Sequence, residues 1–205
     1  MSTVDDDYIS YADADAVQVL VGLRSEAIWQ RLVKEQAMRG LLNWRIVTQL
    51  KPISVLPENE APLINCICNL EISDLKHVSR IVSCLVQAPA ILKIVDGKLL
   101  SEIVAFSDTQ EIIDVINSEP LPIFDPIPKT RYITAKLLDY YATRLLGFTL
   151  GLLPDGYQER YALRYAPDEL PTPQFLDGSR PDDRKVLFYL LSIACQLFIK
   201  EHRRV

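Results

Sequence analysis

The chain has 205 residues, of which 49% are hydrophobic and 24% are charged, and its net charge is −5. A chain of this length can bury a sizeable core, as one domain or as one domain with an arm. The acidic balance argues against nucleic acid as a partner, because no basic stripe is present that could neutralise a run of phosphates. The composition is that of an ordinary globular protein.

The N-terminal sequence MSTVDDDYIS is acidic and lacks the basic and apolar regions of a signal peptide. No run of about 18 apolar residues is present, so no transmembrane helix and no membrane insertion are expected. These features predict a cytoplasmic protein, in which cysteines stay reduced. Apolar neighbours predict buried packing roles for the four cysteines, which are Cys66, Cys68, Cys84 and Cys195.

The first half of the chain predicts a short tail followed by helices. Residues 1–12 are expected to be a mobile acidic tail, and residues 13–205 a single helical domain. A helix is predicted from Asp13 or Asp15 to about Met38, with Gly40 just past its end.

The next helices are predicted from their caps and apolar spacing. One should begin near Asn59 with Pro62 in its first turn, a position where proline costs little. Another should span Ser73 to Gln87, with Ser73 as its cap.

The middle of the chain leaves one choice open. Residues 91–106 could form two short helices around Asp96-Gly97 or a β-hairpin with that turn, and the helical apolar spacing favours helices. The sequence from Ser107 to Gln110 matches a capping box, which predicts a further helix after it.

The stretch EPLPIFDPIPK, residues 119–129, contains four prolines and predicts an extended, semi-rigid linker. It is the best candidate for a division of the domain. Three more helices are predicted at residues 130–152, 155–165 and 182–203. The sequence therefore predicts an all-α fold, a compact multi-helix bundle of about 7–9 helices with proline-rich connecting loops.

Metal-binding residues are few. Cys66, Cys68 and Cys84 with His77 are the one group that could hold zinc, but they lack the paired, turn-based spacing of a structural zinc site. Packed thiols are therefore expected, and neither a metal nor another cofactor. A redox or zinc sensor that uses the three cysteines is the weakest alternative.

Catalytic motifs are equally scarce. The chain has two histidines, and neither lies beside a nucleophile motif, while the glycines form no phosphate-binding loop. His77 is expected to be a solvated helix residue. The sequence therefore favours a protein that is not an enzyme. The alternative is a small helical enzyme or ligand-binding domain whose site lies between helices, near His77, Asp139 or Arg144.

Three stretches occur in a fixed order: Asn43 with LKPISVLP at 50–57, SCLVQAPAILKIVDGKLL at 83–100, and a block beginning LLPDGYQERY at 152. Together they resemble the SctK family, the cytoplasmic sorting-platform adaptors of bacterial type III secretion injectisomes (the OrgA, MxiK and PscK group). The resemblance covers about Leu42 to Phe198. Lys51 stands where the family has a histidine, and Val55 where it has a bulky aromatic residue.

The resemblance implies a non-catalytic adaptor with protein partners. Such an adaptor bridges the SctQ-type pod protein to the cytoplasmic domain of the SctD-type inner-membrane ring protein. It would lie in the cytoplasm, peripheral to the inner-membrane secretion apparatus.

Partner-binding residues are predicted in the loop around 51–57 and in the two later proline-rich loops. Apolar side chains on rigid, extended segments lose little entropy when they bind a partner. The candidates are Leu50, Pro52, Ser54, Leu56, Pro57, Pro122, Phe124, Leu170 and Phe175.

Overall fold

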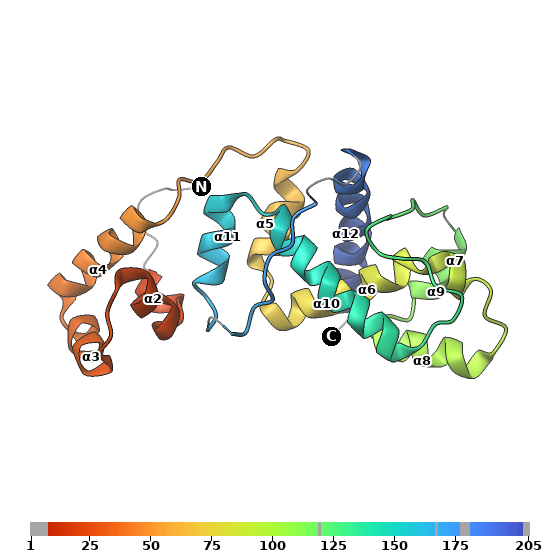
Figure 1. Ribbon diagram of the computed structural model, residues 1–205, viewed down its shortest axis with the longest axis horizontal. Coiled ribbons are helices and arrows are strands. Elements are labelled where there is room, and N and C mark those ends of the chain that lie inside the picture. Colours follow the sequence, from red (N-terminus) through yellow and green to blue (C-terminus); the bar gives the residue numbers. More distant parts are fainter. Residues whose placement is uncertain (1–7, 119, 167, 177–180, 203–205) are drawn as a thin grey trace. The chain divides into compact units, whose positions relative to one another are not determined.

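The computed structural model describes residues 8–118, 120–166, 168–176 and 181–202, and this part of the chain contains twelve helices and no strand. The all-α prediction is confirmed, although the number of helices exceeds the predicted 7–9. The helices belong to two compact units, the first built from residues 1–55 and 153–171 and the second from residues 56–152 and 172–205 (Figure 1).

The first unit contains five helices, drawn in red to orange and in cyan in Figure 1. They are α1 (Tyr8–Tyr11), α2 (Ala14–Val21), α3 (Glu26–Lys34), α4 (Gln36–Gln49) and α11 (Asp155–Ala162). Their core consists of Tyr8, Val17, Trp29, Leu42, Ile46, Leu50 and Leu163. The unit thus combines the N-terminal helices with a segment from much later in the sequence.

The helix predicted from Asp13 to about Met38 is instead divided into three. Gly22 ends α2 with a φ of 75°, a left-handed conformation that glycine adopts without a steric penalty. Glu35 then takes an extended conformation between α3 and α4. Gly40, predicted to follow a helix end, lies inside α4.

The predicted tail, residues 1–12, overlaps the helix α1. Residues 1–7 lie outside the described part, whereas residues 8–11 form α1. Tyr8 is only 3% exposed, because its ring fills the core of the first unit.

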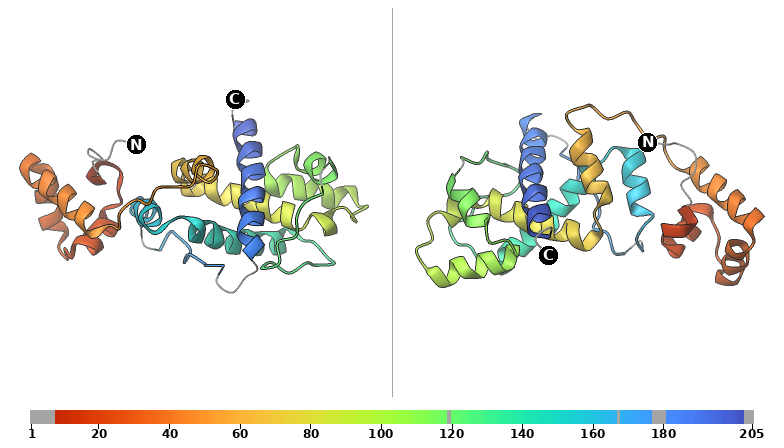
Figure 2. Two further views of the ribbon diagram at one scale, coloured as in Figure 1. Left: turned by 90° about the horizontal axis from the view of Figure 1, so that it is seen from above. Right: turned by 180° about the vertical axis from the view of Figure 1, so that it is seen from behind.

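The second unit contains the other seven helices. They are α5 (Ala61–Asn69), α6 (Ile72–Val86), α7 (Ala88–Ile91), α8 (Gly97–Ser107), α9 (Ile112–Ser118), α10 (Ala135–Leu152) and α12 (Pro181–His202). The long helix α6 is central and packs against both α10 and α12, as the views of Figure 2 show. Its buried row includes Leu75, Val78, Ile81, Val82 and Leu85.

Several local predictions for this unit can be compared with the structure. No β-hairpin follows residue 91, but only the second of the two predicted short helices is present: residues 92–96 are not helical, and Asp96 caps α8 by accepting from the Lys98 amide. The capping box at Ser107 was a wrong prediction, because Ser107 is the last residue of α8. Ser73 is likewise inside α6 and not its cap, which is Glu71.

The proline-rich stretch 119–129 is not the boundary between the units. Residue 119 lies outside the described part, and the residues on both sides belong to the second unit. The buried Gln87 side chain donates to the Pro128 carbonyl at 2.9 Å and accepts from the Thr130 amide at 3.3 Å. These two bonds attach the end of the stretch to the end of α6.

Candidate interaction site

Residues 50–55 follow α4 without helical structure and run past the start of α11, within the first unit. The Lys51 amide donates to Glu159 Oε2 at 2.6 Å, and Lys51 Nζ lies 2.7 Å from Asp155 Oδ2. Arg160 Nη1 donates to the Lys51 carbonyl at 2.8 Å. The amide, the carbonyl and the side chain of Lys51 all bind α11, so the beginning of this segment is held against that helix.

The charges at this contact are complementary. The hydrogen bond to Asp155 raises the pKa of Lys51, and the carboxylate of Glu159 acts in the same direction. Exposed ion pairs contribute little to stability, so the backbone bonds of Lys51 matter more than the charge pairing. Asp155 also lies in the first turn of α11, where a carboxylate is favoured by the helix dipole.

Gly156 permits the close approach of the two segments. A Cβ atom at this position would lie 2.4 Å from the Pro52 carbonyl oxygen, so any other residue would push the segment away from α11. Arg160 makes two further bonds, donating to the Gly156 carbonyl at 2.7 Å and to the Tyr8 hydroxyl at 3.0 Å. Arg160 therefore connects α11 to the segment 50–55 and to α1.

The predicted residues around 50–57 differ in their exposure. Leu50 is buried in the core of the first unit, so it anchors the segment and is not available to a partner. Pro52 and Ser54 are exposed. Leu56 and Pro57 belong to the second unit, where Leu56 is half-buried and Pro57 is exposed.

Val55 is the most exposed apolar residue of the segment. Its side chain is 98% exposed, although it follows a backbone that is held in place at Lys51. It occupies the position where the resemblance expects an aromatic residue. A fixed backbone that presents an apolar side chain to solvent suits the binding of a protein partner.

The candidates in the later loops also fall into buried and exposed groups. Phe124 is 2% exposed and its ring packs edge-on against Phe148 at 5.9 Å, so the prediction that it binds a partner is corrected: it anchors the proline-rich stretch to the core. Pro122 in the second unit and Leu170 in the first are half-buried. Phe175 is exposed.

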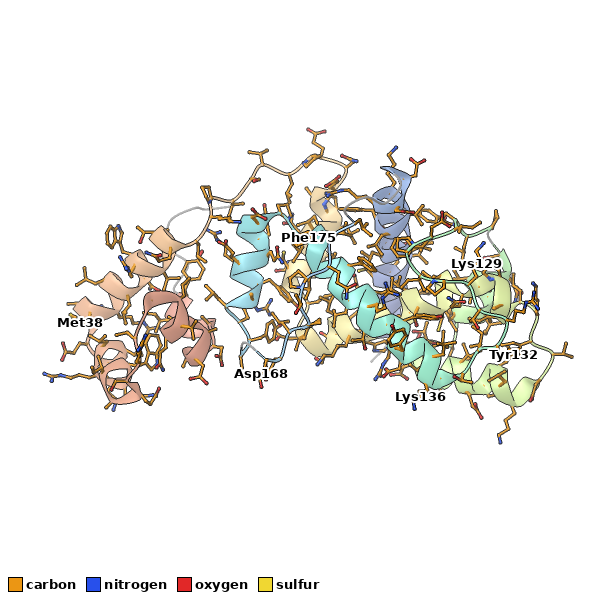
Figure 3. The ribbon with its side chains drawn as sticks, viewed as in Figure 1. Met38, Lys129, Tyr132, Lys136, Asp168 and Phe175 are labelled. Atoms are coloured by element: carbon orange, nitrogen blue, oxygen red, sulfur yellow. The ribbon has the colours of Figure 1, made fainter. Side chains whose placement is uncertain are left out.

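Phe175 follows a segment that lies directly against α10 (Figure 3). The Gln174 amide donates to the Gly147 carbonyl at 2.9 Å. A Cβ atom on Gly151 would lie 2.0 Å from the Gln174 carbonyl oxygen. Two glycines one helical turn apart therefore form the surface on which residues 172–174 lie, within the second unit.

Two cysteines that the sequence did not group together, Cys66 and Cys195, contact each other in the structure. Cys66 of α5 and Cys195 of α12 are hydrogen-bonded, and this bond lowers the pKa of Cys66 to about 7 while it raises that of Cys195. Burial raises the pKa of Cys84 to about 12. Among the described residues no group of three or more His, Cys, Asp or Glu side chains could hold a metal ion.

Cys66 should react with iodoacetamide at a lower pH than an ordinary thiol does. Its thiolate accepts a hydrogen bond from Cys195, so the alkylation rate should reach half its maximum near pH 7. The measurement is the rate against pH in a Cys68→Ser background, with Cys66 followed by mass spectrometry. Cys195→Ala removes the donor and should move the midpoint upward, toward the ordinary pKa of 9.0. A midpoint near 9 in both proteins would contradict the pairing.

The three residues proposed for an enzymatic site each contact a different group. His77 Nε2 lies 2.7 Å from the Ser107 carbonyl oxygen, and its ring packs edge-on against Phe198 at 5.3 Å, so the prediction of a solvated histidine was wrong. Asp139 pairs with Arg80 at 3.6 Å. Arg144 lies over the Phe148 ring at 5.9 Å. The contacts of His77 and Asp139 join neighbouring helices, whereas Arg144 and Phe148 both belong to α10.

Comparison with known proteins adds no assignment. No protein-family model matches the chain, and searches of curated proteins and of solved structures gave no significant match. None of the described helices combines the length and the apolar composition that crossing a membrane requires.

Proposed function

We propose that the chain is a non-catalytic adaptor of a bacterial type III secretion sorting platform. In this role it bridges the SctQ-type pod protein to the cytoplasmic domain of the SctD-type ring protein, at the cytoplasmic side of the inner membrane. The proposal starts from the resemblance of three ordered stretches to the SctK family.

One structural observation supports the proposal most. Two of the three stretches, 50–57 and the block that begins at 152, are about 100 residues apart in the sequence, yet Lys51 binds Asp155, Glu159 and Arg160. Two of the stretches that carry the resemblance thus contact each other in the first unit. Such contacts are expected if the stretches form one functional surface.

The chemistry of this surface suits a protein partner. The exposed residues next to the Lys51 contact are Pro52, Ser54 and Val55, which offer apolar area and backbone groups for a partner to bind. Because Lys51 already holds the beginning of the segment on α11, binding need not order that part of it.

The test is recovery of the two partners from cells that express a secretion apparatus, with the tagged full chain as bait. Val55→Asp should reduce recovery of one partner at least about tenfold, as burial of an unpaired carboxylate in an interface requires. Val95→Asp is the matched control, because Val95 is an equally exposed valine (97%) in the second unit.

The outcomes test the proposed function and the proposed binding surface separately. If the unmodified chain recovers neither the pod protein nor the ring protein, the proposed function is wrong. If it recovers them and Val55→Asp does so equally well, the adaptor function stands and the surface lies elsewhere.

A further inference from the structure

Helix α4 carries apolar side chains on two opposite faces. Leu42 and Ile46 are buried against the other helices of the first unit. Leu41 and Trp44 are 60% and 65% exposed, and Val47 is exposed beside them. A helix that only covered a core would have polar residues on this second face.

The exposed residues form a row with helical spacing. Ala37, Leu41, Trp44 and Thr48 follow the i, i+4, i+7, i+11 pattern and therefore lie along one side of the helix, which continues past Met38 in Figure 3. Gly40 lies beside the row, and a Cβ atom there would have nothing within 4 Å. Small residues next to Leu41 and Trp44 leave room for a second helix to approach closely.

The part of the sequence that contains the row is basic, in contrast to the chain as a whole. Residues 24–49 contain five cations and two anions, in a chain whose net charge is −5. Glu35 pairs with Arg31 at 3.7 Å, and Glu26 accepts hydrogen bonds from Gln18 and Gln30. Both anions thus have partners of their own.

Two of the cations remain available. Lys34 precedes the row and Arg45 lies next to Trp44, and both are exposed. Neither forms an ion pair within the described residues. Arg45 is on α4 itself and Lys34 ends the preceding helix, and cations close to an apolar row attract an oppositely charged surface.

We infer that the α4 face formed by Ala37, Gly40, Leu41, Trp44, Val47 and Thr48 binds an amphipathic helix of a partner protein, with acidic residues flanking its apolar side. Trp44 provides the central contact, since tryptophan is enriched among the few residues that supply most of the binding energy of an interface. Arg45 and Lys34 set the charge of the partner. The inference does not depend on a secretion apparatus, because it uses only the shape and charge of this face.

Other occupants fit the face less well. A second copy of the chain would bring the same cations against Arg45 and Lys34, and like charges across an interface are unfavourable. An anionic membrane would satisfy the cations but would receive only three large apolar side chains, since the other apolar face of α4 is already buried.

The test uses the full chain as bait for a displayed library of helical peptides with randomised faces. The enriched peptides should carry an apolar row with Asp or Glu on its flanks. Trp44→Ser should weaken their binding at least about tenfold, and Arg45→Glu should weaken it and reverse its salt dependence. Val19→Ser, at an exposed valine of α2 in the same unit, is the matched control and should bind normally.

The inference would be overturned by enrichment of basic or uncharged peptides, or by peptides that bind Trp44→Ser as well as the unmodified chain. It would also be overturned by binding of the chain to phosphatidylserine vesicles that Trp44→Ser abolishes, or by a dimer in sedimentation experiments that Trp44→Ser dissociates. The last two would assign the face to a membrane or to a second copy. A library that yields no peptide above background would likewise contradict the inference.

Discussion

Gly151→Ala should destabilise the second unit, although alanine is the better helix former. The new Cβ would lie 2.0 Å from the carbonyl oxygen of Gln174 and 2.8 Å from its carbonyl carbon, and both are backbone atoms that cannot rotate away. Residues 172–174 would have to move off α10 and lose the bond from the Gln174 amide to Gly147. We expect a loss of roughly 2–3 kcal/mol in the free energy of unfolding.

A series of glycine substitutions tests this reason. Gly147→Ala should cost less, because the nearest atoms lie at 3.2 Å and include the flexible side chain of Gln174. Gly40→Ala has open space and should stabilise the chain by about 0.5–1 kcal/mol. Urea unfolding followed by far-UV circular dichroism measures all three. A Gly151→Ala protein as stable as Gly40→Ala would contradict the contact.

The sequence predicted helices well where one local signal dominated. Residues within a single turn determine where α5 begins, with Pro62 in its first turn. The same is true of the end of α10 and the start of α11, which lie on either side of Pro154. Proline restricts its own φ in any fold, so long-range contacts do not change a prediction that depends on a proline.

The first unit was harder to predict because long-range contacts hold it together. The bonds from Lys51 to α11 span more than 100 residues, and that from Arg160 to Tyr8 spans 152. Local composition marked residues 1–12 as an acidic tail, since nothing nearby in the sequence indicates a partner for Tyr8. In the sequence, Gly22 is likewise compatible with a helix interior, and only the structure shows its left-handed conformation.

The candidate site was predicted as a segment but not as individual side chains. Proline and apolar content identified the regions 50–57 and 119–129, yet composition cannot tell which apolar residue of a loop faces the core. Leu50 and Phe124 proved to be anchors, and Val55 proved to be exposed. The α4 face was not predicted. The signal that could have indicated it is a second apolar row on one helix, because Leu41 and Trp44 have helical spacing on the side opposite Leu42 and Ile46.

Arg160→Met should release the segment 50–55 and α1 from α11. Methionine keeps most of the apolar length of the side chain but donates no hydrogen bond, so the Lys51 carbonyl and the Tyr8 hydroxyl lose their charged donor. We expect a loss of about 2–3 kcal/mol in the stability of the first unit. Both tryptophans of the chain, Trp29 and Trp44, belong to this unit, so tryptophan fluorescence during urea unfolding reports on it specifically.

Three further variants distinguish this role of Arg160 from a general effect of charge removal. Tyr8→Phe removes only one of the bonds and should cost about 1 kcal/mol. Arg45→Met removes an exposed arginine of the same unit and should leave stability unchanged within about 0.5 kcal/mol. Because Arg160 and Tyr8 are in direct contact, the double variant Arg160→Met/Tyr8→Phe should lose less than the sum of the single losses. Additive losses, or an Arg160→Met protein as stable as Arg45→Met, would show that the three segments are held together by other contacts.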